Sequence, residues 1–129
     1  KGLMEMPKLD LPAGILVTIS ARGQFRVGGG WDDTGPLGYE TPSGYNLDGP
    51  PFAAANHGKA VAVVTRDGLS QGVLVGDCAF FVASGGGKVL LGINDEDHEN
   101  NTGELLFTVE TKLPNILSFG QTDFVGPCM

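Results

Sequence analysis

Residues 95 to 101 form a polar connection whose side chains could bind a cation. They read DEDHENN and separate the apolar run 88–94 from the alternating segment 104–110. Because neighbouring carboxylates repel one another, a bound positive ion would stabilise such a cluster. Carboxylate and amide oxygens are hard donors that suit Ca²⁺, which takes about six to eight oxygen ligands. His98 is the only nitrogen ligand nearby, so the pattern disfavours zinc and copper.

The same connection also fits a solvated acidic turn that binds nothing. Asn and Gly are common in turns for conformational reasons, and the fixed ligand positions of an EF-hand are absent. Spacing by itself therefore leaves both interpretations open.

The elements that must position this connection are predicted to be β-strands. The apolar runs are short and alternating, Gly and Pro fall mostly between them, and no window has helical periodicity beyond one turn. The predicted strands span residues 14–21, 23–28, 59–65, 71–76, 78–84, 88–94, 104–110 and, less securely, 115–120. In the 104–110 run, Leu105, Phe107 and Val109 share one face, which we expect to face a core. We predict one all-β domain over residues 1–129, a jelly-roll-like β-sandwich of two antiparallel sheets.

Composition excludes two classes of partner. The chain has 129 residues and a formal net charge of −7, so nucleic acid, which needs a basic surface, is not expected. No apolar run approaches the roughly 18 residues of a membrane span, and no membrane partner is expected. The first residue is Lys1, which is compatible with an upstream signal peptide or preceding domain.

The two cysteines carry no metal or redox motif. Cys78 lies in an apolar run and Cys128 lies near the last residue. Lone thiols in apolar strands are usually small buried side chains, so we expect that role for Cys78. A Cys78–Cys128 disulfide is the less favoured alternative.

Residues 28–59, termed the long connection below, resist the strand pattern. The segment holds Trp31 and both tyrosines among Gly, Pro and acidic residues. A loop of that length is usually functional or disordered, and the aromatic content favours function, although Trp31 fits a core position equally well. His57, near its end, has no nucleophile motif beside it and is expected to be a turn or capping residue. The segment 112–129 is expected to form an edge strand, a packing arm or a subunit contact.

One family resemblance extends this interpretation. The order HGKAVAVVTRDG, then GVLVGDCAFFVASGGGKVLLGINDEDHENNTGELLFTVE, with an earlier GWDDTGP, resembles the PA-IL-like (LecA-like) family of calcium-dependent galactose-binding bacterial lectins. The match covers roughly residues 14 to 111 and leaves 112–129 as a C-terminal extension. The pair IND and NNTG is its most specific part. The resemblance implies a galactose-binding-domain-like sandwich, and an extracellular or periplasmic location.

The resemblance also implies site residues. Calcium would be held by the backbone carbonyls of Thr34 and Asp97. The side chains of Asp95, Asn100 and Asn101 would complete the set of protein ligands. The ion would ligate two neighbouring hydroxyls of a galactoside. Tyr45 and Asp48 fall near the positions that hold the rest of the sugar, and Tyr39, Tyr45 or Trp31 could stack on its apolar face.

Three functions are compatible with these observations. Calcium-dependent binding of galactose-containing glycans is favoured, with affinity raised by homo-oligomerisation or by attachment to a larger chain. A calcium-stabilised structural or assembly domain is the alternative. A glycoside-active enzyme is less favoured, because nothing selects a catalytic pair among Asp32, Asp33, Asp48, Asp95 and Asp97. We therefore expect that the chain is not an enzyme.

Overall fold

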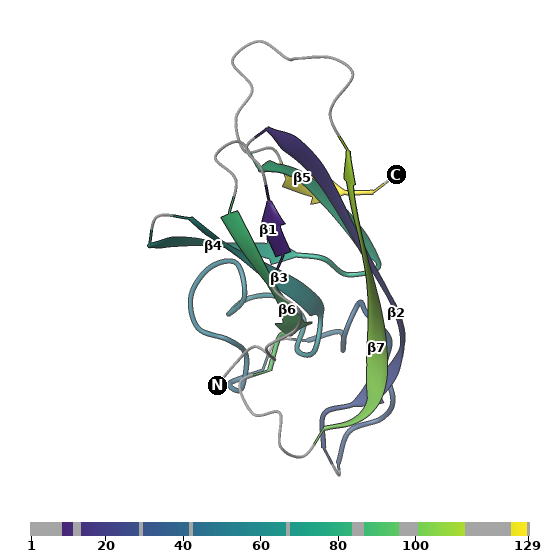
Figure 1. Cartoon of the computed structure of the whole chain (residues 1–129). Coiled ribbons are helices and arrows are strands. Elements are labelled where there is room, and N and C mark those ends of the chain that lie inside the picture. Colours follow the sequence, from purple (N-terminus) through teal and green to yellow (C-terminus); the bar gives the residue numbers. More distant parts are fainter. Residues whose placement is uncertain are drawn as a thin grey trace.

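The structure is a computed structural model that contains strands and loops but no helix in the residues it describes (Figure 1). The described residues are 9–11, 14–28, 30–41, 43–66, 68–83, 87–95, 101–112 and 125–128. Within them the strands form two antiparallel sheets, and the predicted all-β sandwich is confirmed. The less secure strand over residues 115–120 lies outside the described residues.

Each sheet has four strands within the described part of the chain. Sheet one has the order β1-β6-β3-β4 and sheet two the order β7-β2-β5-β8. The bounds in sheet one are Leu9–Leu11 (β1), Gly87–Ile93 (β6), Ala60–Arg66 (β3) and Leu69–Leu74 (β4). Those in sheet two are Thr102–Lys112 (β7), Ile15–Arg26 (β2), Cys78–Ala83 (β5) and Val125–Pro127 (β8). The chain crosses between sheets after β6, so the acidic connection, residues 95–101, links sheet one to sheet two.

One strand is longer than its sequence pattern predicted. The runs 14–21 and 23–28 are joined in β2, which pairs with β7 continuously from Leu16 to Arg26. Gly23 has a φ of 124° inside this strand, and a side chain there would meet the backbone of Glu104 on β7. Gly23 therefore permits close approach of the two strands and does not end β2.

The core lies between the sheets. In β2 buried and half-buried residues alternate, with Ile15, Val17 and Ile19 buried. These side chains pack with residues of β3, β5 and β6 from both sheets. Leu105, Phe107 and Val109 of β7 pack against the same cluster, so the face predicted to be apolar does meet the core. Alternation at period two thus fixes which side of each strand is buried.

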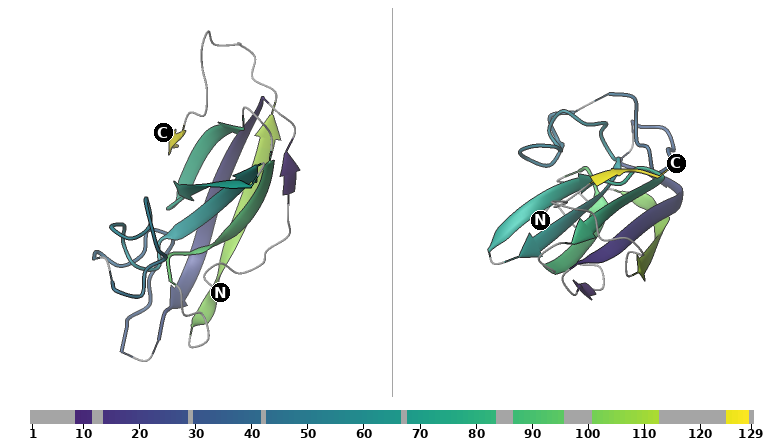
Figure 2. Two further views of the ribbon diagram at one scale, coloured as in Figure 1. Left: turned by 90° about the vertical axis from the view of Figure 1, so that its left-hand side faces the viewer. Right: turned by 90° about the horizontal axis from the view of Figure 1, so that it is seen from above.

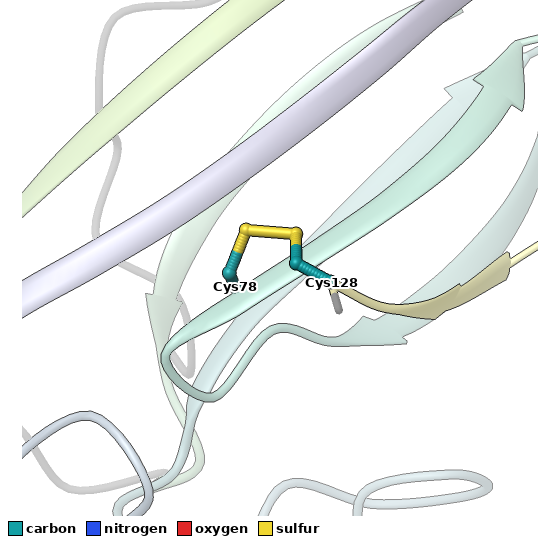
Figure 3. The surroundings of a disulfide bond; sticks show 2 residues. All are labelled: Cys78 and Cys128. Carbon is teal, nitrogen blue, oxygen red and sulfur yellow. A yellow bond between two sulfur atoms is a disulfide. The ribbon is translucent and has the colours of Figure 1, made fainter.

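The cysteine prediction was wrong. Cys78 begins β5, Cys128 follows β8, and their sulfur atoms form a disulfide (Figure 3). β8 pairs with β5, and the Cys128 N–H donates to the Cys78 carbonyl at 3.1 Å. The backbone pairing of these strands brings the two Cα atoms to 5.3 Å, within the range that a disulfide requires. The bond therefore fastens β8 to the edge of sheet two.

The described residues of the long connection, 28, 30–41 and 43–59, form no strand of either sheet and lie beside the sheets (Figure 2). Its residues Leu47 and Phe52 are buried against Val61 of β3, with Val63 and Leu74 packed around them. Since Ala60 and Ala62 face the main core, Val61 and Val63 belong to the opposite face of sheet one. The long connection thus covers that face and builds a second apolar cluster.

No helix in the described ranges is long and apolar enough to cross a bilayer.

Candidate functional site

Two segments that are far apart in sequence meet at one end of the sandwich. The Trp31 ring lies 5.1 Å from the His57 ring, measured between centroids, and His57 Nε2 lies 3.9 Å from Asp95 Oδ1. Trp31 also packs against a buried cluster that includes Ile93, at the end of β6. Within the described residues, Trp31 and Asp95, the first residue of the acidic connection, therefore lie on either side of His57.

Asp95 begins the acidic connection and is buried. Only 2% of the residue is exposed, and its N–H donates to the Ile93 carbonyl at 2.8 Å. A buried carboxylate is costly unless hydrogen bonds, an opposite charge or a metal ion compensate for the lost water. The position of Asp95 therefore suits a cation ligand better than a freely solvated turn residue.

His57 lies in a turn, as predicted, and it is also buried beside Asp95, which the sequence did not predict. Only 2% of the residue is exposed. His57 Nδ1 lies 2.7 Å from Asn46 Oδ1, and the Asn46 Nδ2 group donates to three carbonyls, those of Phe52, Ala53 and Ala55. The Asn46 oxygen can only accept, so Nδ1 carries the proton in neutral His57 and Nε2 faces Asp95. Nothing in the local sequence signals this arrangement, because Asn46 comes from another part of the long connection.

Burial favours the neutral form of the His57 ring. Burial lowers its pKa from the ordinary value of 6.5, and the nearby Asp95 charge opposes that shift. At 3.9 Å the two side chains are beyond hydrogen-bonding distance. His57 is thus a neutral, oriented neighbour of the Asp95 carboxylate.

Asn94 was missed by the sequence interpretation, which concentrated on charged residues. It is fully buried, with 0% exposure, and its side chain makes three hydrogen bonds to the long connection. Oδ1 accepts from the Leu47 N–H at 3.0 Å, and Nδ2 donates to the carbonyls of Phe52 and Asn56 at 2.9 and 3.0 Å. The only available signal was its place between Ile93 and Asp95 in the motif IND.

The other predicted calcium ligands differ in how much the structure describes. Asp97 and Asn100 lie outside the described residues. Asn101 is half-buried, and its Oδ1 atom is buried without a hydrogen-bond donor. Buried acceptors normally receive a hydrogen bond. A bound cation would take the place of the missing donor, and amide oxygens are ligands that Ca²⁺ accepts.

Thr34 is held by backbone pairing. Its N–H donates to the Phe25 carbonyl at 2.8 Å, and its own carbonyl accepts from the Phe25 N–H at 2.9 Å. Its hydroxyl donates to the Gly38 carbonyl at 3.0 Å. The Thr34 carbonyl, predicted to be a ligand, retains its second lone pair.

Tyr39 and Trp31, two of the predicted ligand-binding residues, are partly buried and pack together. The Tyr39 hydroxyl donates to the Asp32 carbonyl at 2.6 Å and accepts from the Val27 N–H at 3.3 Å. Burial is the main reason that its pKa is raised. Trp31 and Tyr39 contact each other with ring centroids 4.6 Å apart. Both are partly buried, so Trp31 serves as part of the wall beside His57.

Tyr45 and Asp48, in contrast, are exposed. Tyr45 is 63% exposed, and Asp48 is also accessible. The residues between them, Asn46 and Leu47, are buried. These two exposed side chains are thus free to meet a ligand while their neighbours hold the backbone in place.

Two further observations concern a cavity beside Asn101 and the grouping of possible metal ligands. A cavity of about 370 Å³ lies beside Asn101 and is lined mainly by apolar residues, among them Phe25, Ile93, Leu105 and Phe107. Among the described side chains, no three His, Cys, Asp or Glu residues are grouped so that they could hold a metal ion.

No protein-family model matches this chain, and no curated protein is significantly similar to it. The lectin-like motifs therefore stay a sequence-based prediction.

Proposed function

We propose that the protein binds carbohydrates through a calcium ion held by the acidic connection, with galactosides as the expected ligands. The observation that supports the proposal is the burial of side-chain oxygens at the two ends of that connection. Asp95, a residue that is 2% exposed, carries a carboxylate, and Asn101 carries a buried oxygen without a donor. Both are hard donors of the kind that Ca²⁺ prefers.

Several residues would hold the ion. Asp95 would supply the formal negative charge and Asn101 an amide oxygen, while the Thr34 carbonyl would add a backbone ligand from the adjacent loop. Asp97 and Asn100 complete the set implied by the sequence. The ion, when bound, supplies open coordination positions that two neighbouring sugar hydroxyls can take in place of water.

The exposed residues of the long connection would recognise the remainder of the sugar. The Asp48 carboxylate can accept hydrogen bonds from hydroxyl groups, and the Tyr45 ring can pack on the apolar face of the pyranose. A hydrated sugar loses many hydrogen bonds to water on binding, so directional polar contacts matter more than apolar area. Monovalent binding of this kind is weak, and oligomerisation or attachment to a larger chain would strengthen it.

The disulfide supports a location outside the cytoplasm. Disulfides form and persist in oxidising compartments and are rare in the cytosol. Cys78 and Cys128 are bonded, which agrees with the extracellular or periplasmic location expected for a glycan-binding protein.

Burial of Asp95 also favours a second candidate, a domain that calcium only stabilises. A carboxylate so far from solvent can hold an ion whose function is purely structural. Both candidates predict calcium binding, and only the first predicts calcium-dependent retention on a galactose resin.

The experiment compares the wild-type protein with Asp95→Asn and a charge-matched control. Glu110→Gln serves as that control, because Glu110 is an exposed carboxylate on β7. We expect calcium to change the fluorescence of Trp31, the single tryptophan, in the wild type and in the control but not in Asp95→Asn. Retention of the wild type on galactose resin only with calcium supports the lectin function. Calcium binding without retention on galactose, galactan or other glycans favours the structural candidate.

A further inference from the structure

In the segment 45–48 of the long connection, two exposed residues flank two buried ones. Tyr45 is 63% exposed and Asp48 is exposed, whereas Asn46 and Leu47 are only 4% and 9% exposed. The segment forms no part of a strand. The direction of its two exposed side chains therefore depends on what holds Asn46 and Leu47.

Asn94 holds Leu47 from the end of β6. Its Oδ1 atom accepts from the Leu47 N–H at 3.0 Å, which fixes the backbone between Tyr45 and Asp48. Its own backbone is fixed by the two residues that precede β3, since the Asn94 N–H donates to the Lys59 carbonyl at 2.8 Å and its carbonyl accepts from the Gly58 N–H at 3.0 Å. Asn94 is thus a rigid anchor between the sheet and the loop.

Asn46 braces the same loop from within. Its Nδ2 group donates to the Phe52 carbonyl at 3.2 Å, and the Asn94 Nδ2 group donates to the same carbonyl at 2.9 Å. Two amide side chains from distant parts of the chain therefore converge on one oxygen atom. Because both donors are buried, loss of either side chain would leave buried polar groups without partners, which is destabilising.

We infer that Asn94 is a positioning residue that fixes Tyr45 and Asp48 relative to the Asp95 carboxylate, and so determines sugar specificity at the proposed calcium site. This inference depends on the proposed function for its ligand. Asn94 and Asp95 are consecutive in the chain. The residue that anchors the sugar-facing loop is therefore next to the proposed ion ligand. Displacement of a binding group by about 1 Å can cost two orders of magnitude in activity at a preorganised site.

The same connection predicts reciprocal coupling. If ordering of the segment 45–48 favours the geometry that binds calcium, then calcium must favour the ordered segment by the same free energy. The amide of Leu47 reports this order directly, because its N–H is bonded to Asn94. Calcium should slow hydrogen exchange at that amide in the wild type, by no more than about the 3-fold factor allowed for calcium affinity below.

The test compares Asn94→Ala with Asn56→Ala as a matched control. Asn56 is an amide of the same long connection whose side chain bonds to the Leu37 carbonyl at 3.2 Å and is partly exposed. Calcium affinity, methyl galactoside affinity and exchange at Leu47 are measured on folded protein, checked by circular dichroism. We expect Asn94→Ala to weaken sugar binding by about 10-fold or more, to keep calcium affinity within about 3-fold, and to speed exchange at Leu47. The control should keep wild-type values for all three.

The inference is overturned if Asn94→Ala binds sugar as the wild type does, or if it loses calcium and sugar affinity equally. If Asn94→Ala fails to fold, the wild type decides, because unchanged exchange at Leu47 on adding calcium also overturns the inference. Failure of the proposed function has a different result: the wild type itself then binds neither calcium nor methyl galactoside. In that case, equal exchange at Leu47 in Asn94→Ala and Asn56→Ala would remove the positioning role as well.

Discussion

Loss of the Cys78–Cys128 disulfide should lower the free energy of unfolding by about 4 kcal/mol. The cysteines are 50 residues apart, and the loop-entropy relation for a closed loop of that length gives about 14 cal/mol/K, or about 4 kcal/mol at 25 °C. The unfolding entropy of a chain of 129 residues makes each kcal/mol worth about 4 °C in Tm. The expected decrease in Tm is therefore about 15 °C.

The assay is thermal unfolding followed by circular dichroism. The wild type is compared with and without reductant, and with the double variant Cys78→Ala, Cys128→Ala. Reductant should lower the Tm of the wild type to near that of the double variant, whose Tm it should leave unchanged. Two free thiols in the unreduced wild type, or a decrease of less than about 4 °C, would refute the loop-entropy reasoning.

Three more predictions follow from the site and the strands around it. Because burial holds the pKa of His57 below its unfolded value of 6.5, the unfolded chain takes up more protons, so stability is full above that pH and falls below it. In chelator, melts from about pH 6.5 to 5.5 should show a slope of up to about 1.4 kcal/mol per pH unit that His57→Gln reduces; an unchanged slope would exclude His57 as its source. Calorimetry should show that Asp95→Ala loses calcium and galactoside binding together, whereas Tyr45→Ala weakens only the galactoside; normal sugar binding by Asp95→Ala would contradict a metal-bridged site. Gly103 has a φ of 89°, and a Cβ there would lie 2.6 Å from the Gln24 carbonyl oxygen. In denaturant unfolding, Gly103→Ala should therefore lower the free energy of unfolding by more than about 1 kcal/mol. Gly44, where a Cβ would meet open space, is the control, and Gly44→Ala should change that free energy little.

The strands were predictable because their signal is local. Alternation at period two in β2 and β7 depends on neighbouring residues, and it identified the face of β7 that carries Leu105 and Phe107. Gly23 misled the prediction of β2, since glycine is as useful for close strand approach as for a turn. A local pattern does not separate these two uses.

The interior of the site was less predictable because its contacts are long-range. His57 is buried through the Asn46 side chain, and Asn94 bonds to Leu47 across 47 positions. The disulfide similarly joins strands that are distant in sequence and adjacent in sheet two. Such partners are specified by topology, which sequence spacing alone does not provide. Asp95 was chosen as a candidate ligand because a charged cluster in a short connection is visible in the sequence without knowledge of its neighbours.

The central claim is that calcium held at Asp95 carries sugar binding, and calorimetric titration of methyl galactoside tests it most directly. The titration is made into the wild-type protein in millimolar calcium, and again after calcium is removed with chelator. Binding heat with calcium that disappears in chelator and returns when calcium is restored is the result we predict. Equal binding in both conditions, or no binding in either, would contradict the account.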